Sequence, residues 1–279
     1  MTYNDLKYSL VDGIKSCHNS GVDIRVITSN IRFENPEDGP HDWRFRKNLL
    51  AERLLAFHPQ LIGTQEGRQA QIRELQTLLT GQALLESHRQ WIHERMYPCF
   101  FYDPLILRPI RQQDFWLSAT PYIGGSKLLK SQFPRLVLWC EFEHRPSKNI
   151  FIAGVCHLDH ELESTRLDQA KILLQQLAIF NPSKLPVLLM GDFNSPPQSL
   201  THNHLLTDGP NWIDPWHEKR QPERPSTHHF GKEKLESARI DWILIPQIWR
   251  CQSIEMDQTQ QQGIYPSDHY PILASLSTL

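Results

Sequence analysis

Four acidic side chains of this sequence lie next to apolar, β-rich runs. Glu66 and Asp192 each directly follow such a run, and Asp241 directly precedes one. The fourth acid, Asp268, stands beside His269 in a Ser-Asp-His triplet. Carboxylates gathered at strand ends repel one another, and such a cluster is unfavourable unless a cation neutralises it. The pattern therefore predicts a β-rich fold in which several strands end at a cation site.

Length and composition fit one compact globular enzyme. A chain of 279 residues is large for a single domain but acceptable for a two-sheet architecture, and 39% hydrophobic residues suffice for a core. We expect an N-terminal extension over residues 1–22, and one catalytic domain over residues 23–279 that acts as a monomer. The net charge of −2 argues against tight nonspecific binding of duplex DNA, but it leaves nucleic acid open as a substrate.

The cysteines and the hydropathy pattern indicate the compartment. The five cysteines are odd in number and form no Cys-x-x-Cys pair, so we expect buried thiols in a reducing environment. The N-terminus lacks the continuous apolar stretch of a signal peptide, and no run approaches the length of a membrane span. These features predict a soluble cytoplasmic protein without a membrane partner.

Hydrophobic periodicity predicts alternating strands and helices. Residues 23–28 alternate as a strand does and deliver Asn30 at the tip, and strand-like runs dominate residues 83–155. Ser164 is the candidate N-cap of the third long helix. Apolar residues recur at helical spacing in four segments: 3–15, 49–57, 72–79 and 165–180. Long polar loops are expected over residues 195–210 and 219–238.

The polar residues at these tips suit the hydrolysis of a phosphoester. Mg²⁺ prefers hard oxygen ligands, and Asn30, Glu66 and Asp268 provide them. His157, at the end of an apolar run, could donate to a phosphate oxygen when protonated. His269 could act as a base or an acid, which contributes roughly 10²- to 10⁴-fold when the group is well positioned.

Two further pairs follow from the alternation of side chains along a strand. His269 needs an acceptor for its second ring nitrogen, and Asp241 is the candidate, because the adjacent Asp268 would point to the opposite face. Asp192 and Asn194 are two residues apart and would face the same side. Together they could hold a water molecule and a phosphate oxygen.

The complete set of motifs resembles the endonuclease/exonuclease/phosphatase superfamily, which is related to DNase I. The order and approximate spacing of the motifs match over the chain from about Asp23 onward. The motifs that carry the resemblance are Ser29-Asn30, Thr64-Gln65-Glu66, His157-Leu158-Asp159-His160, Gly191-Asp192-Phe193-Asn194, Arg239-Ile240-Asp241-Trp242-Ile243 and Pro266-Ser267-Asp268-His269-Tyr270-Pro271.

The resemblance implies a fold and a role for each residue. The fold would be an α/β four-layer αββα sandwich with two mixed β-sheets face to face. Glu66 would be the main Mg²⁺ ligand, with Asn30 and Asp268 nearby and Mn²⁺ as a substitute ion. Asp192 would orient or activate the attacking water, and Asn194 would contact that water or the phosphate. His269 would be the catalytic histidine, paired with Asp241. His157 would contact the scissile phosphate.

Residues 115–121 and 134–139 resemble a compact bacterial branch of this superfamily. In this branch Arg135 and Tyr102 could also reach the phosphate. The substrate stays open among single-stranded nucleic acid, a nucleotide, a phosphosugar and a phospholipid head group. The superfamily resemblance therefore predicts the chemistry of the site more closely than its ligand.

Two alternatives belong to other functional classes. One is a catalytically silent member that binds a phosphorylated ligand or a protein partner. The other is a zinc-dependent hydrolase built on His202, His204, His228 and His229, although their spacing is not that of an ordered zinc site. The sequence contains no Gly-x-Gly-x-x-Gly, Walker or Gly-x-Ser-x-Gly motif, which argues against dinucleotide enzymes, P-loop NTPases and serine hydrolases.

Overall fold

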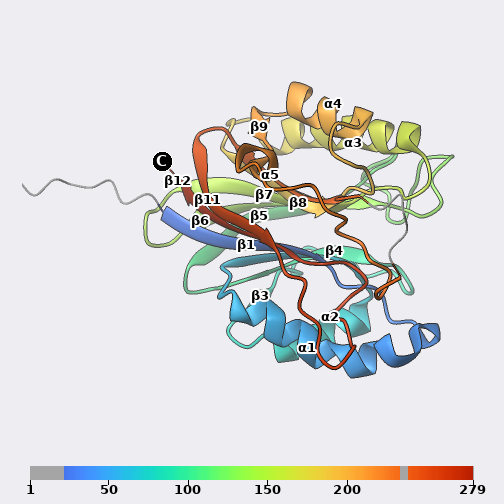
Figure 1. Ribbon diagram of the computed structural model, residues 1–279. Coiled ribbons are helices and arrows are strands. Elements are labelled where there is room, and N and C mark those ends of the chain that lie inside the picture. Colours follow the sequence, from blue (N-terminus) through green and yellow to red (C-terminus); the bar gives the residue numbers. More distant parts are fainter. Residues whose placement is uncertain (1–21, 233–237, 279) are drawn as a thin grey trace, which may run out of the picture.

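The computed structural model describes residues 22–232 and 238–278. Residues 1–21 of the expected N-terminal extension, with its helix, lie outside the described residues, and residue 22 already belongs to the first strand. Two six-stranded sheets pack face to face, and helices cover the outer side of each (Figure 1). This arrangement confirms the four-layer αββα sandwich. The strands are β1 (Val22–Asn30), β2 (Leu61–Gly67), β3 (Ala83–Leu84), β4 (Tyr97–Tyr102), β5 (Leu107–Trp116), β6 (Leu136–His144), β7 (Ile150–His157), β8 (Val187–Asp192), β9 (Trp212–Ile213), β10 (Asp241–Pro246), β11 (Trp249–Met256) and β12 (Ile272–Thr278). The helices are η1 (Pro36–His41), α1 (Trp43–Ala56), α2 (Gln69–Leu78), α3 (Glu163–Phe180), α4 (Leu200–Asp208) and α5 (Pro215–Glu218).

Both sheets are mixed, as expected. The first has the order β11-β12-β1-β2-β4-β3, and the second has the order β5-β6-β7-β8-β10-β9. Each contains one parallel pair, β1 with β2 and β7 with β8, while their other pairs are antiparallel. The strands of a parallel pair end at the same edge of the sheet, which gathers their C-terminal residues.

The apolar runs form because both faces of the central strands are buried. Val26 and Leu188 point into the core between the two sheets, whereas Ile27 and Leu189 pack under the helices on the outer faces. All four side chains are at most 1% exposed. A strand buried on both sides carries apolar residues at consecutive positions, and its polar residues are then confined to its ends.

The three long helices expected from the sequence are present, with earlier starts. Helix α1 begins at Trp43, where Asp42 caps it by accepting from the Arg44 backbone N–H at 2.9 Å. The prediction that Ser164 caps α3 is wrong, because Leu162 is the N-cap residue and makes no side-chain hydrogen bond there. Its cap position is instead tied to Asp159, which accepts from the Leu162 backbone N–H at 3.2 Å.

Helix α4 lies in the segment 195–210, where the sequence analysis expected a loop. Ser199 caps this helix by accepting from the His202 backbone N–H at 3.1 Å. The buried residues of α4 are Thr201, His202 and Leu205, so two of its three inward positions are polar. A helix with such a short apolar stripe gives almost no periodic signal.

Four of the five cysteines lie in the described residues, where they are free and buried as expected: Cys99, Cys140, Cys156 and Cys251. No helix in the described parts of the chain has the length and apolar character needed to cross a membrane.

Candidate active site

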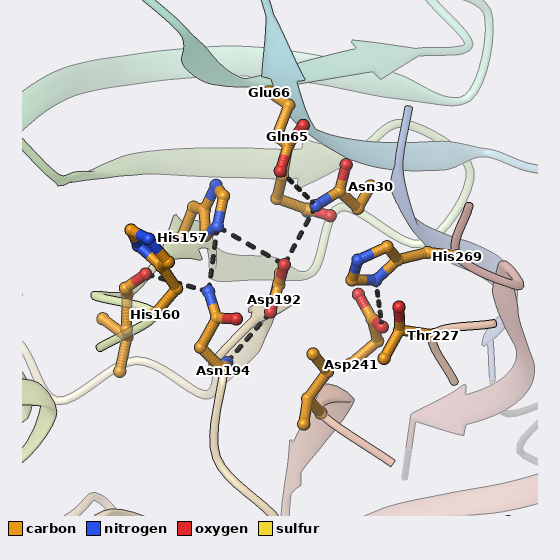
Figure 2. A network of polar contacts seen from close by, with 12 residues as sticks. Asn30, Gln65, Glu66, His157, His160, Asp192, Asn194, Thr227, Asp241 and His269 are labelled. Carbon is orange, nitrogen blue, oxygen red and sulfur yellow. Dashed lines mark hydrogen bonds and ion pairs between the residues drawn. The ribbon is translucent and has the colours of Figure 1, made fainter. Parts of the chain in front are cut away.

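The polar strand ends meet at one edge of the sandwich (Figure 2). In the second sheet, the register places His157 beside Asp192, and Asp192 beside Asp241. In the first sheet, Asn30 ends β1 next to the end of β2, which carries Glu66. The side chains of both sheets therefore face one another across the gap where the strands end.

Glu66 and Asp192 come from different sheets and share one hydrogen-bond donor. Asn30 Nδ2 donates to Glu66 Oε1 at 3.0 Å and to Asp192 Oδ2 at 2.9 Å (Figure 2). Asn30 Oδ1 accepts from the backbone N–H of Arg32 at 2.9 Å, which fixes the orientation of the amide. Asn30 thus presents N–H groups to the two carboxylates, whereas the sequence analysis expected it to offer an oxygen to a metal ion.

Asp192 is the most deeply buried carboxylate of this pair. Burial, together with the nearby Asp241 carboxylate, raises the pKa of Asp192 well above its ordinary value, against the opposing effects of His269 and of the hydrogen bond from Asn30. The backbone N–H of Asn194 donates to Asp192 Oδ1 at 2.9 Å. A carboxylate held in place with a raised pKa is a stronger base than an exposed one.

His269 and Asp241 form the expected pair. His269 Nδ1 lies 2.8 Å from Asp241 Oδ2, which also accepts from Ser226 Oγ at 2.6 Å. Burial disfavours a charged imidazole, but Asp241 and the other carboxylates outweigh it and raise the pKa of His269 well above its usual value. The pair thus holds a proton on Nδ1 and directs Nε2 away from Asp241.

His157 differs from its expected state because it is neutral. Burial and the neighbouring Arg135 guanidinium lower the pKa of His157 well below its usual value. Arg135 Nη1 lies 2.9 Å from His157 Nδ1, and a guanidinium can only donate, so Nδ1 must accept. The proton of the neutral ring is therefore on Nε2, which lies 3.4 Å from Asp192 Oδ2. His157 can donate into the site without being protonated, in contrast to the prediction from the sequence.

Asn194 joins His157 to the loop that follows β8. Its Nδ2 donates to the Leu158 carbonyl oxygen at 3.1 Å. The same Nδ2 lies 3.0 Å from His157 Nε2, which is a contact between two N–H groups and not a hydrogen bond when the ring proton is on Nε2. Its backbone has a positive φ of 50°, and Glu66 has one of 68°. Such left-handed conformations are unfavourable for side-chain-bearing residues and tend to occur at functional sites.

The site contains a cavity of about 480 Å³, a volume typical of small-molecule sites, and it is lined by Glu66, His157, Asp192, Asn194 and His269. Asp268 also lines it, and its Oδ2 lies 4.0 Å from Arg32 Nε. Arg32, Phe33 and Arg68 also line the cavity and were not predicted from the sequence. The only signal in the sequence was their position, because each lies two or three residues beyond a recognised site residue, Asn30 or Glu66.

The structure separates the two expected phosphate-contacting residues. Arg135 lines the cavity and contacts the two histidines His157 and His160. Tyr102 instead pairs with Leu61 at the start of β2, at the far end of β4 from Tyr97, which lines the cavity. The expectation that Tyr102 reaches the phosphate is corrected accordingly, because its ring packs near Phe142 in the core between the sheets.

The histidine-rich segments form no metal-ligand cluster of their own within the described residues, although His229 lines the cavity. His202 Nε2 lies 3.3 Å from Asp214 Oδ2, and the ring of His228 stacks on Tyr270 with 4.0 Å between centroids. Burial lowers the pKa of His228 to about 4. Within the described residues, no group of three metal-binding side chains includes a histidine of these segments. The geometry offers no support for a zinc site there.

The carboxylate cluster does fit a divalent cation. One ligand atom each from Glu66, His157 and Asp192 lies within 4.8 Å of the others. The hydrogen bonds between these two carboxylates and the rest of the protein include only neutral donors. The pKa of Asp192 is raised mainly by its burial and, after that, by the neighbouring Asp241 carboxylate. A cation of charge +2 would neutralise this cluster, and carboxylate oxygens are the ligands that Mg²⁺ prefers.

Comparisons with known proteins agree with this architecture. The model of the Endonuclease/Exonuclease/phosphatase family matches residues 27–269. A solved endonuclease/exonuclease/phosphatase from Bacteroides vulgatus is 23% identical, with a TM-score of 0.85 over 92% of this chain and 100% of its own. A functionally unknown conserved protein from Enterococcus faecalis is 25% identical, with a TM-score of 0.80 over 92% of this chain and 100% of its own. A mannosyl-6-phosphatase from Bacteroides thetaiotaomicron is 22% identical, with a TM-score of 0.78 over 91% of this chain and 99% of its own. No curated protein matches the chain.

Proposed function

Because the chain belongs to the Endonuclease/Exonuclease/phosphatase family, whose members hydrolyse phosphoesters, we propose that it is a Mg²⁺-dependent phosphoesterase. The reaction would be the in-line attack of an activated water on a phosphodiester or a phosphomonoester. One observation carries the proposal: Glu66, Asp192 and His269 line the same cavity, and His269 is held by Asp241, with ligand atoms of Asp192, Asp241 and His269 within 4.8 Å of one another.

Different residues would act on the attacking water, on the leaving oxygen and on the non-bridging oxygens of the phosphate. Asp192, with its raised pKa, would orient the attacking water and accept its proton. His269, held by Asp241, would supply a proton to the leaving oxygen. The N–H of His157 would donate to a non-bridging oxygen, where negative charge must be stabilised.

A Mg²⁺ ion held by Glu66 and Asp268 would screen the negative charge of the phosphate. Asn30 would keep Glu66 and Asp192 in place through its two hydrogen bonds. The same protein contacts would serve with Mn²⁺, which also takes carboxylate ligands.

The size of the cavity bears on the substrate. A volume of about 480 Å³ suits a nucleotide, a phosphosugar or the end of a single strand better than a duplex. The likeness to a mannosyl-6-phosphatase favours a phosphosugar as the second candidate, next to nucleic acid or a nucleotide.

A screen of purified protein tests the proposed activity. The panel is single-stranded DNA and RNA, nucleotides, phosphosugars, phospholipids and the two 4-nitrophenyl phosphate esters, each with Mg²⁺, Mn²⁺ or EDTA. The variants Glu66→Gln, Asp192→Asn and His269→Ala should each lower turnover by orders of magnitude and remain folded. Near wild-type rates in any two of them would defeat the assignment, and Mg²⁺ binding without any hydrolysis would favour a silent phosphate-binding protein.

A further inference from the structure

The cavity has a basic end beside the proposed catalytic end. The ring of Phe33 lies between two guanidinium groups, with its centroid 4.4 Å from Arg32 Cζ and 5.0 Å from Arg68 Cζ. Arg95 also lines this end, together with the acidic Glu94. An aromatic ring flanked by cations forms a surface that attracts anionic groups.

Arg68 differs from Arg32 in its partners. Arg32 makes two hydrogen bonds to the Asp38 carboxylate, at 3.1 and 3.0 Å, and is neutralised by it. The nearest carboxylate oxygen to Arg68 belongs to Glu94 and lies 3.8 Å from its Nε, too far for a hydrogen bond. Its Nε is buried without a hydrogen-bond partner, and its Nη1 makes one long bond, 3.4 Å, to a backbone oxygen. The donors of Arg68 are thus mostly unused.

The basic end lies close to the proposed reacting centre. Arg68 follows Glu66 by two residues, directly after the end of β2, and lines the same cavity. Phe33 joins the two ends, because its backbone N–H donates to Glu66 Oε2 at 3.2 Å while its ring meets Arg68. A ligand the size of one sugar ring could therefore place one anionic group at each end.

We propose that this protein selects phosphoesters that carry a second anionic group about one sugar ring away from the scissile phosphate, and that Arg68 binds this second group. The inference rests on the proposed phosphoesterase function and narrows its substrate class. Arg68 supplies a planar, permanently charged fork that matches a phosphate or carboxylate. Glu94 competes for the same fork and limits the affinity.

Binding of a matched pair of ligands tests the proposal without turnover. The probes are fructose 6-phosphate and fructose 1,6-bisphosphate, titrated calorimetrically with Mg²⁺ into the His269→Ala protein. The bisphosphate should bind at least about tenfold more tightly, the range expected for one charge-assisted contact. Adding Arg68→Met should abolish this preference and change the affinity for the monophosphate much less.

Two further variants separate a ligand contact from a structural effect. Arg73→Met removes an arginine of α2 that pairs with Glu86 and does not line the cavity, so the preference should persist. Glu94→Gln removes the competing carboxylate, so the bisphosphate should bind a few-fold more tightly. Thermal unfolding of each variant verifies that it is folded.

The outcomes distinguish a failure of the second anionic subsite from a failure of the proposed phosphoesterase function. Equal affinity for both probes, or an equal loss of both on Arg68→Met, would overturn the second anionic subsite. A preference that depends on Arg68, in a native protein that hydrolyses none of the screened phosphoesters, would refute the hydrolase and retain the subsite. Hydrolysis of bisphosphates over monophosphates by the native protein would support both.

Discussion

Replacing Asp241 by asparagine removes the charge behind His269 while the side chain keeps its shape. Asp241 Oδ2 contacts both His269 Nδ1 and Ser226 Oγ, whereas Oδ1 is buried and lacks a hydrogen-bond partner. If the new NH₂ group occupies the Oδ1 position, its donors are buried without an acceptor. If it occupies the Oδ2 position, it donates to His269 Nδ1 and moves the ring proton to Nε2.

Either arrangement predicts a sizeable effect. A buried donor without a partner costs about 1–3 kcal/mol, so the free energy of unfolding should fall by roughly that amount. Loss of the oriented imidazolium should lower kcat by about 10²- to 10⁴-fold. The carboxylate charge raises the pKa of His269, so this pKa should fall in the variant, and the alkaline limb of the pH-rate profile should move to lower pH.

Three measurements on Asp241→Asn check this reasoning: the NMR titration of the His269 ring, urea unfolding, and hydrolysis of 4-nitrophenyl phosphate with Mg²⁺. Asp214→Asn is the matched control, because Asp214 is also buried against a histidine, but that histidine, His202, does not line the cavity as His269 does. The control should lose stability and keep its rate. An Asp241→Asn protein with unchanged kcat and an unchanged His269 titration would refute the role of the pair.

Three further predictions concern the metal, the pH and the packing. Glu66→Gln should weaken Mg²⁺ affinity, measured by calorimetry, by at least about tenfold, because a neutral amide is a poorer ligand; unchanged affinity would place the ion elsewhere. Burial alone would raise the pKa of Asp114, but Arg89 outweighs it and lowers this pKa to about 2. The carboxylate therefore contributes about 2 kcal/mol of stability above its ordinary pKa of 3.8, which is lost as the pH falls through 2. The stability gap between wild type and Asp114→Asn should accordingly narrow between pH 5 and pH 2 in urea unfolding. Gly154→Ala would place a Cβ 2.1 Å from the ring of Trp139, so unfolding should become easier by about 1–3 kcal/mol, and a neutral effect would show that this core can shift.

The sequence predicted that the site residues lie together, because the ends of the strands can be recognised in the residue pattern. Apolar runs on doubly buried strands end abruptly at Glu66, His157 and Asp192, and these ends meet at one edge. The pairing of Asp241 with His269 followed from a simple requirement for an acceptor. Such features depend on the backbone, whose course the residue pattern largely determines.

The features that the sequence did not predict depend on contacts that no local pattern encodes. The amide of Asn30 is oriented by a backbone N–H two residues away, and the neutral state of His157 depends on its burial and on an arginine 22 residues earlier in the chain. Tyr102 was expected near the phosphate from the resemblance to the bacterial branch, yet it lies at the other end of its strand from the cavity. Side-chain orientation and protonation thus required the tertiary structure.

The antiparallel pairing of β12 with β1 joins segments from opposite ends of the fold, with Ile24 opposite Leu276. A ribosome therefore releases Glu66 and Asp192 long before the strand that closes the first sheet and carries the loop with His269 into place. Until then, one edge of β1 is unpaired, and the nascent polypeptide lacks the imidazole of His269. Translation order alone should keep a partly made chain inactive, and it makes the same unfinished edge a natural target for chaperones.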